Sequence, residues 1–344
     1  MRAIRYHQFG CPSDVLQIEK VEMPLFKDNE VLVQMQLRSI NPSDLLTIRG
    51  RYPSRIKLPA IPGYEGVGVI VDKGTAVTDL LIGQRVLGLG GIWSYTNKGS
   101  GGFLQSMQKT GTWQEYVAMN AETIVPVPNE IDGSTAAQLY INPLTAWLML
   151  KYELKLRKGD IFIANACGSA IGRLFAEFAL IFGYELIGVT RSDAYDESLN
   201  QLGVKKVINT AKVPLVETLL AYTRGRKVTA ALDAVGGKDG VELAHCVQEG
   251  GTMLLYGLLS GEQHPHNIHA FLSSSIKIKN YRLRDWVLTT PLKQRISIFL
   301  DMIDHFVRYQ ISLPSGPIFD LAEIKKAVES AELLDRTGKV LLSG

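Results

Sequence analysis

The sequence predicts a two-domain α/β protein in which a doubly wound parallel sheet accompanies a β-rich domain. Three observations predict this fold class. The chain has 344 residues, which is more than one domain usually holds. Residues 1–125 contain short strand-like runs interrupted by Gly, Pro and Asp. From about Pro128 onward, apolar strand-like runs alternate with helical stretches, as in a parallel sheet covered by helices on both faces.

The first third is predicted to be mostly β-strand. The runs 31–37 (VLVQMQL) and 66–71 (GVGVIV) have strand composition. Segment 63–68 (GYEGVG) is dense in glycine, which indicates tight turns or close backbone contacts. These features favour a β-rich first domain over residues 1–126.

The rest of the chain is predicted to form the parallel sheet and a short tail. After a helical stretch at 134–152, predicted strands cover 160–166, 186–190, 206–208, 228–234 and 251–256, and a sixth could lie at 275–283. Predicted helices cover 170–182, 194–202, 215–223 and 240–248. The tail is predicted to contain helices at 294–309 and 321–333 and a strand at 339–342. We expect the domains to span 127–285 and 286–344, with the tail returning to the first domain and a cleft between the two.

Composition and charge exclude several classes of protein. The net charge is +3 and no basic block is present, so nucleic acid is not an expected partner. Cys11, Cys167 and Cys246 are too few and scattered for a disulfide scaffold or a zinc ribbon, and they fit a reducing compartment. The N-terminus lacks an apolar signal-peptide core, and no run approaches the roughly 20 apolar residues that cross a bilayer. We expect a cytoplasmic protein with no membrane partner.

A turn rich in small residues follows the first predicted strand of the parallel sheet and opens a helix. Ala166, Ser169 and Gly172 leave room for backbone amides and the helix N-terminus to approach a pyrophosphate. The strict G-x-G-x-x-G string is absent, so an ordinary strand–helix turn is the alternative. The predicted cofactor contacts in this turn are Cys167, Gly168, Ser169, Ala170, Ile171 and Gly172.

The second predicted strand ends in Thr190, Arg191 and Ser192, about 20 residues past the small-residue turn. An NAD-specific fold places Asp or Glu there to bind the ribose hydroxyl, whereas Arg suits a 2′-phosphate. Arg offers a planar, permanently charged donor fork. The sequence therefore predicts NADPH as cofactor, and a solvated loop residue is the alternative for Arg191.

The fourth and fifth predicted strands also end in small residues. Val235 and Gly236 follow one strand, and Tyr256, Gly257 and Leu258 follow the next. Carboxyl ends of parallel strands line the ligand crevice of open α/β sheets, so these residues are predicted to contact the nicotinamide half. Ordinary turn chemistry is the alternative.

With these motifs in place, the chain resembles the medium-chain dehydrogenase/reductase superfamily over nearly its full length. The markers are 63–66 (GYEG), 83–86 (GQRV) and 337–341 (TGKVL). The resemblance implies a GroES-like catalytic domain beside a Rossmann domain. Metal-binding members carry Cys in the turn 41–44, His at the place of Tyr64, and four further clustered cysteines. Those ligands are missing here, so the resemblance implies a metal-free enzyme. His264, His266 and His269 are predicted to be solvated loop residues.

Within the superfamily the chain is most similar to 2-enoyl thioester reductases of fatty-acid synthesis, and next to quinone oxidoreductases. The similar segments are 41–44 (NPSD), 50–54 (GRYPS), 111–113 (GTW) and 142–146 (NPLTA). Tyr64 departs from the Asn that those reductases often show. Arg282 and Arg284 depart from a more apolar segment. These departures concern the acyl pocket and leave the cofactor site unaffected.

The resemblance implies catalytic roles for Tyr52 and Asn41. Tyr52 would donate a proton or bind the thioester oxygen, since a phenol with a pKa near 10 is protonated at neutral pH. Its alternative is loop packing beside Pro53. Asn41 would contact the nicotinamide ribose or the substrate, with a structural Asn-Pro turn as alternative.

The resemblance also implies residues beside the nicotinamide and the substrate. Asn142 and Thr145 would lie next to the nicotinamide, with a helix cap as alternative. Trp113 and Trp286 would form the wall of a substrate pocket, with core packing as alternative.

Two other functions stay open. An NADPH:quinone oxidoreductase would also deliver hydride to a conjugated acceptor. A catalytically silent NADPH-sensing or RNA-binding protein is the alternative of another class, disfavoured by the lack of a basic stripe. A small-molecule substrate and a homodimer are expected, because segment 275–283 alternates polar and apolar residues like an edge strand and relatives pair through that region.

Overall fold

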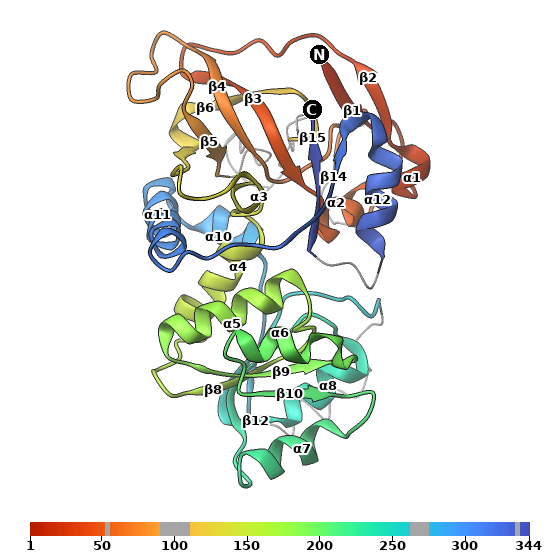
Figure 1. Ribbon diagram of the computed structural model, residues 1–344, viewed down its shortest axis with the longest axis vertical. Helices are drawn as coiled ribbons and strands as arrows, with labels where there is room; N and C mark the ends of the chain where they lie inside the picture. The colour runs from red at the N-terminus through yellow and green to blue at the C-terminus, as the bar shows by residue number, and fades with distance from the viewer. Residues whose placement is uncertain (52–55, 90–110, 262–274, 334–337) are drawn as a thin grey trace, which may run out of the picture. The chain divides into compact units, whose positions relative to one another are not determined.

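The computed structural model describes residues 1–51, 56–89, 111–261, 275–333 and 338–344. The chain divides into two compact units. Unit 1 comprises Met1–Ile141 and Thr290–Gly344, and unit 2 comprises Asn142–Thr289. Unit 1 is built on a largely antiparallel sheet and unit 2 on a parallel one, so the predicted fold class is confirmed (Figure 1).

The sheet of unit 1 joins strands from both ends of the chain. Among the described residues the strand order is β14-β15-β3-β4-β5-β7, and β6 pairs with β3. The C-terminal strand β15 runs antiparallel to β3, with Leu341 opposite Ser39. The tail therefore completes the sheet that the first third begins. The strands are β3 (Glu30–Ser39), β4 (Val67–Lys73), β5 (Arg85–Gly88), β6 (Tyr116–Asn120), β7 (Ile124–Pro126), β14 (Ser315–Asp320) and β15 (Lys339–Ser343), with β1 (Arg2–Arg5) and β2 (Gln17–Lys20) paired separately.

Helices cover the core of unit 1. Ile48, Trp113 and Val328 belong to one buried cluster formed by α1, α2, α12 and the neighbouring strands. The long helix α11 buries an apolar stripe that includes Phe299 and Phe306, as the spacing of an amphipathic helix requires. The helices are α1 (Pro12–Val15), α2 (Pro42–Ile48), α3 (Gly133–Ala136), α11 (Leu292–Arg308) and α12 (Ile324–Glu332), with 3₁₀ turns η1 (Ala121–Thr123) and η4 (Leu321–Glu323).

Unit 2 contains a parallel sheet with the strand order β10-β9-β8-β11-β12-β13. Each parallel pair needs a crossover, and α5 and α6 cover one face while α7 and α8 cover the other (Figure 1). The order reverses between β8 and β11, which is where doubly wound sheets bind ligands. The strands are β8 (Ile161–Ala164), β9 (Glu185–Thr190), β10 (Lys206–Asn209), β11 (Val228–Asp233), β12 (Val247–Leu255) and β13 (Lys277–Asn280). The helices are α4 (Asn142–Leu148), η2 (Met149–Glu153), α5 (Ala170–Phe182), η3 (Asp193–Tyr195), α6 (Asp196–Gln201), α7 (Leu215–Tyr222), α8 (Gly237–His245) and α10 (Leu283–Thr289).

The single helix predicted over 134–152 is wrong. Helix α3 ends at Ala136, α4 starts at Asn142, and a π-helical segment follows from Met149. Pro143 explains the restart, because proline disfavours helical backbone at the preceding residue and fits the first turn of a new helix.

Several elements were not predicted, among them α2, β14 and α10. Helix α2 is short and has Pro42 in its first turn. Strand β14 contains Gly316 and Pro317, which weaken strand composition but are tolerated at a sheet edge. Helix α10 begins at Leu283, where the predicted sixth strand was expected to end, and β13 is correspondingly short.

Candidate cofactor site and active site

The small-residue turn after β8 has the geometry of a phosphate cradle. Ser169 is the N-cap of α5, and its Oγ accepts the N–H of Gly172 at 3.2 Å. A Cβ on Gly172 would lie 2.5 Å from Cα of Cys167, so α5 packs against the turn with no space for a side chain. Ala166 takes a left-handed conformation with φ of 52°. The turn thus brings the amino end of a 13-residue helix to the carboxyl edge of the sheet, where backbone amides attract anions.

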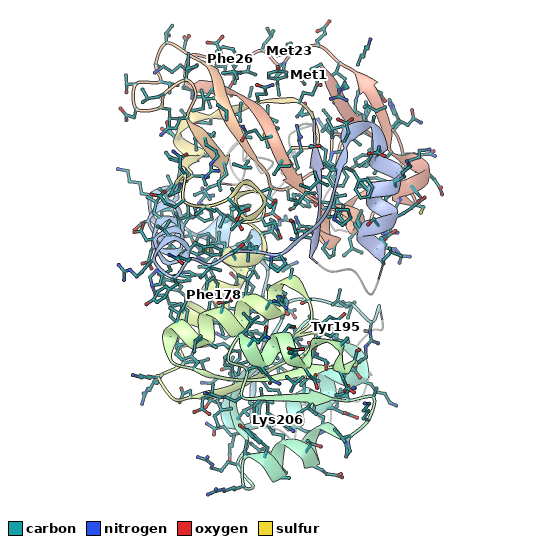
Figure 2. The ribbon with its side chains drawn as sticks, viewed as in Figure 1. Met1, Met23, Phe26, Phe178, Tyr195 and Lys206 are labelled. Carbon is teal, nitrogen blue, oxygen red and sulfur yellow. The ribbon has the colours of Figure 1, made fainter. Side chains whose placement is uncertain are left out.

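Gly168 and Cys167 serve different purposes in this turn. The ring of Tyr195 (Figure 2) lies beside Gly168, where an added Cβ would be 2.6 Å from Cδ2 of the ring. The Cys167 side chain is buried, and its Sγ donates to the carbonyl of Ala164 at 3.1 Å. Burial raises the pKa of this thiol to about 12. Cys167 can therefore meet a cofactor only through its backbone. Ala170 and Ile171 are half-buried in the first turn of α5.

The loop after β9 presents one cation and one paired acid. Arg191 is exposed and forms no hydrogen bond or ion pair with the residues that the structure describes. Thr190 donates to the carbonyl of Ser192 at 3.0 Å, and Ser192 caps η3. Asp193 accepts from Asn209 at 2.6 Å and forms an ion pair with Lys212. The Asp193 carboxylate is thus already paired with Asn209 and Lys212, while the Arg191 guanidinium remains available to an anion.

A buried Asn–Asp pair joins the ends of β8 and β11 at the switch point. Asn165 donates to Oδ1 of Asp233 at 2.6 Å and accepts the N–H of Ala234 at 2.8 Å. The same Oδ1 accepts the N–H groups of Val235 at 2.8 Å and Gly236 at 2.9 Å. These bonds fix the backbone that was predicted to contact the cofactor. Asn165 and Asp233 were not predicted as site residues, although a polar residue at the end of each of two buried strands was the available signal.

The end of β12 supplies Tyr256, Gly257 and Leu258. The Tyr256 hydroxyl is buried and lacks a hydrogen-bond partner among the described residues. Burial raises the pKa of this phenol, so it stays neutral at physiological pH. Gly257 and Leu258 are exposed at the carboxyl edge of the sheet. The predicted positions at the ends of β8, β9, β11 and β12 therefore share one edge of one sheet.

Unit 1 contains a buried polar cluster centred on Glu65. Its Oε2 accepts the N–H groups of Tyr140 at 3.1 Å and Ile141 at 2.7 Å. Its Oε1 accepts from the Ser39 hydroxyl and lies 3.6 Å from Nζ of Lys339. The Glu65 and Lys339 side chains are only 1% and 5% exposed. This arrangement, called here the Glu65 cluster, ties β3, β4 and the C-terminal strand together.

The side-chain amide of Asn41 is fully hydrogen-bonded within the Glu65 cluster. Its Nδ2 donates to Ser39 at 3.1 Å and to Glu65 at 2.8 Å, and its Oδ1 accepts from Lys339. Its backbone N–H donates to Asp44 at 2.8 Å, which anchors the start of α2. Because both amide protons are used inside the protein, these contacts favour the structural alternative for Asn41 over a direct catalytic role. Burial raises the pKa of Asp44 to about 7.

The position that would hold zinc in metal-binding relatives has different chemistry here. The Tyr64 hydroxyl and Thr47 Oγ1 are hydrogen-bonded at 2.6 Å in a buried setting. No group of three or more His, Cys, Asp or Glu side chains that could hold a metal occurs among the described residues. Zinc binds thiolates, imidazoles and carboxylates, so a phenol–hydroxyl pair does not fit it.

The remaining predicted site residues belong to both units. Trp113 is fully buried in the core of unit 1, as the core alternative stated. Trp286 is half-buried on α10 of unit 2. Asn142 begins α4 and Thr145 is buried on the same helix. Tyr52 and the histidines at 264, 266 and 269 lie outside the described residues.

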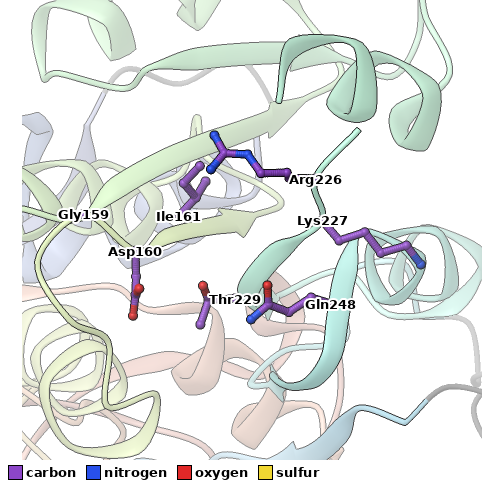
Figure 3. A pocket seen from close by; sticks show the side chains of 7 residues that line it. All are labelled: Gly159, Asp160, Ile161, Arg226, Lys227, Thr229 and Gln248. Carbon is purple, nitrogen blue, oxygen red and sulfur yellow. The ribbon is translucent and has the colours of Figure 1, made fainter. Parts of the chain in front are cut away.

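A surface hollow of about 390 Å³ lies at the amino ends of β8 and β11 (Figure 3). Ligands of doubly wound sheets bind at the opposite, carboxyl edge, so this hollow is separate from the candidate cofactor site. It is lined by Gly159, Asp160, Ile161, Arg226, Lys227, Thr229 and Gln248.

In the described part of the chain no helix is both long and apolar enough to cross a membrane.

Comparisons with known proteins identify relatives of this chain. The alcohol dehydrogenase GroES-like domain family matches residues 27–129, and the zinc-binding dehydrogenase family matches residues 170–303. The mitochondrial enoyl-acyl-carrier-protein reductase of Caenorhabditis elegans is 31% identical over 290 residues, which are 83% of this chain and 79% of the relative.

Two solved structures have the same fold over the full chain. A Bacillus thuringiensis protein, described as a candidate NADPH:quinone reductase, is 40% identical with a TM-score of 0.90, covering 100% of this chain and 98% of that one. The Escherichia coli quinone oxidoreductase in complex with NADPH is 23% identical with a TM-score of 0.86, covering 100% of both chains.

Proposed function

Because this chain belongs to the medium-chain dehydrogenase/reductase superfamily, we propose that it is an NADPH-dependent, metal-free reductase. The proposed acceptor is the conjugated C=C bond of a 2-enoyl thioester. The observation that carries the proposal is the carboxyl edge of the parallel sheet. There the cradle at Gly172 suits the pyrophosphate of a 2′-phosphorylated dinucleotide, and Arg191, which has no partner among the described residues, suits its 2′-phosphate.

The residues of unit 2 would bind and orient the cofactor. The turn around Ser169 and the N-terminus of α5 would hold the pyrophosphate, and Arg191 the 2′-phosphate. The Asn165–Asp233 pair fixes the backbone that would approach the nicotinamide half. Asn142 and Thr145 on α4 are proposed to lie beside the nicotinamide. Bound NADPH would supply the hydride.

Tyr52 is the proposed acid, on the resemblance of its segment to the reductases. Reduction of an enoyl thioester needs a proton at the α carbon and a hydrogen bond to the oxygen on which negative charge develops. A protonated phenol can provide either. Asn41 is proposed to fix the start of α2 through the Glu65 cluster rather than to contact the substrate.

The proposal of a metal-free reaction rests on residue chemistry. One matching family is named for zinc, but the Tyr64–Thr47 pair does not supply ligands that zinc prefers. Turnover that survives dialysis against a chelator is the expected result. A loss of turnover that added zinc restores would contradict the proposal.

A quinone reductase is the second candidate, favoured by the 40% identity to the Bacillus thuringiensis protein. The two candidate reactions differ in their need for a proton donor. An enoyl thioester needs a precisely placed acid such as Tyr52, whereas a quinone can accept hydride without it. NADPH oxidation should be followed with crotonyl-CoA and with phenanthrenequinone. An enoyl reductase should turn over crotonyl-CoA and lose that activity in Tyr52→Phe while any quinone activity persists. Turnover of the quinone alone would support the second candidate. Turnover of neither acceptor would support the hypothesis of a catalytically silent, NADPH-sensing protein.

We also propose a homodimer and a cytoplasmic location. Among the described residues β13 is the outer strand of the unit 2 sheet, and an unpaired edge invites a second chain. A mass of two chains by light scattering is expected, and a mass of one at micromolar concentration would contradict the dimer. The free thiols of Cys11, Cys167 and Cys246 fit a reducing compartment, which fractionation of cells would test.

A further inference from the structure

The loop after β9 holds a carboxylate whose position is fixed from β10 and the turn that follows it. Asn209, the last residue of β10, is opposite Thr190 in the sheet and donates to Asp193 Oδ1 at 2.6 Å. Asn209 also accepts the N–H of Ala211 at 3.0 Å through its own Oδ1, which orients its amide. Lys212 forms an ion pair with the second oxygen, Oδ2. Both carboxylate oxygens of Asp193 are therefore occupied.

Asp193 is already paired at this edge of the sheet, whereas Arg191 is not paired with any described residue. Asp193 and Lys212 are 47% and 65% exposed, and the hydrogen bonds from Asn209 and Lys212 lower the pKa of Asp193, so it is ionised at neutral pH. Arg191, two positions earlier, has no partner among the described residues. The edge thus offers one accessible cation beside one neutralised acid.

An unpaired acid close to the end of the second strand has a known consequence in this type of sheet. It accepts a hydrogen bond from the ribose 2′-hydroxyl and so selects NAD, and it repels a 2′-phosphate. Asp193 lies three positions after Thr190, the last residue of β9, and would compete with Arg191 for control of the 2′ position if it were free. Its pairing with Lys212 removes that competition.

We propose that Lys212 is a specificity-determining residue that favours NADPH over NADH by holding Asp193 away from the ribose 2′ position. This role rests on the proposed use of NADPH, and it assigns the preference for NADPH over NADH to Lys212 and Asp193. Lys212→Ala should release the carboxylate, weaken NADPH binding and leave NADH binding unchanged or tighter. One additional unit charge near a phosphate in a solvated site changes affinity on the order of 3- to 10-fold. Salt should reduce the effect, because the groups are exposed.

Binding measurements test this without relying on turnover. Dissociation constants for NADPH and NADH should be obtained by calorimetry for the wild type, Lys212→Ala, Asp193→Asn and the double variant. Adenosine 2′,5′-bisphosphate and AMP serve as an unreactive pair that differs only in the 2′-phosphate. Lys227→Ala is the matched control, because it removes an exposed lysine at the amino edge of the same sheet.

Lys212→Ala should have a lower NADPH/NADH affinity ratio than the wild type, the double variant should recover that ratio, and Lys227→Ala should leave it unchanged. An unchanged ratio in Lys212→Ala would overturn the proposed role of Lys212. A double variant as poor as Lys212→Ala would also overturn it, because Lys212 would then act on the phosphate without Asp193. A wild type that binds NADH as tightly as NADPH contradicts the proposed cofactor instead, which separates the two failures.

Discussion

Lys339 gives the most quantitative test of the structure of unit 1. Its ammonium lies 3.6 Å from Glu65, and the two side chains are 5% and 1% exposed. Lys339→Met keeps most of the aliphatic volume and removes the charge. Glu65 would keep its hydrogen bonds from Ser39, Asn41, Tyr140 and Ile141 but would lose its only cation among the described contacts. Water cannot replace that cation in a buried site.

The expected loss follows from the burial of the pair. Removing one partner of a buried ion pair typically costs about 3–5 kcal/mol, because the other charge stays uncompensated. The four hydrogen bonds that Glu65 retains place the expected loss near the lower end, at about 3 kcal/mol. That is a large share of the roughly 5–15 kcal/mol that stabilises a typical domain.

Equilibrium urea unfolding followed by tryptophan fluorescence measures this loss. Lys326→Met is the matched control, because Lys326 and Glu323 form an exposed pair at 3.2 Å that should contribute less than about 1 kcal/mol. Replacing Glu65 by Gln together with Lys339→Met should recover part of the stability, since no buried charge is left. A loss in Lys339→Met no larger than in Lys326→Met would refute the buried pair.

Three further predictions concern the cofactor site and the start of α2. Gly172→Ala should weaken NADPH binding on the order of tenfold or more, measured by calorimetry, because the new Cβ would meet the backbone of Cys167 at 2.5 Å and displace α5; unchanged binding would contradict the cradle. Arg191→Ala should raise the KM for NADPH and leave that for NADH unchanged, and equal effects on both would contradict the 2′-phosphate assignment. Burial raises the pKa of Asp44 from 3.8 to about 7, so folding favours its protonated form, and this contribution is complete below about pH 4 and lost as the pH rises through 7. Asp44→Asn should therefore flatten the fall in unfolding free energy between about pH 4 and 7, a fall of at most about 1.4 kcal/mol per pH unit from this group, and an unaltered pH profile would contradict it.

Local sequence patterns were sufficient for the parallel sheet. The apolar run 170–182 follows a strand and a small-residue turn, and α5 spans those residues. The second strand was predicted at 186–190 and β9 covers Glu185–Thr190. In such units each strand and helix buries its own apolar face, so composition and period carry the information.

The polar interiors could not be predicted in the same way. Glu65 bonds to Tyr140 and lies beside Lys339, which are far apart in the chain, and only the completed sheet of unit 1 brings them together. Asn165 and Asp233 meet for the same reason, since β8 and β11 are neighbours only after the crossover. Asn41 was assigned to catalysis on its motif, and its contacts with this cluster became apparent only from the fold.

The proposed reaction is the transfer of hydride from NADPH to the β carbon of a 2-enoyl thioester. It is tested most directly with NADPH carrying deuterium at both C4 positions and crotonyl-CoA as acceptor, with mass spectrometry of the thioester product. Saturated butyryl-CoA with one deuterium on its β carbon is the predicted result. Oxidation of the labelled NADPH without label in a saturated thioester would contradict the claim.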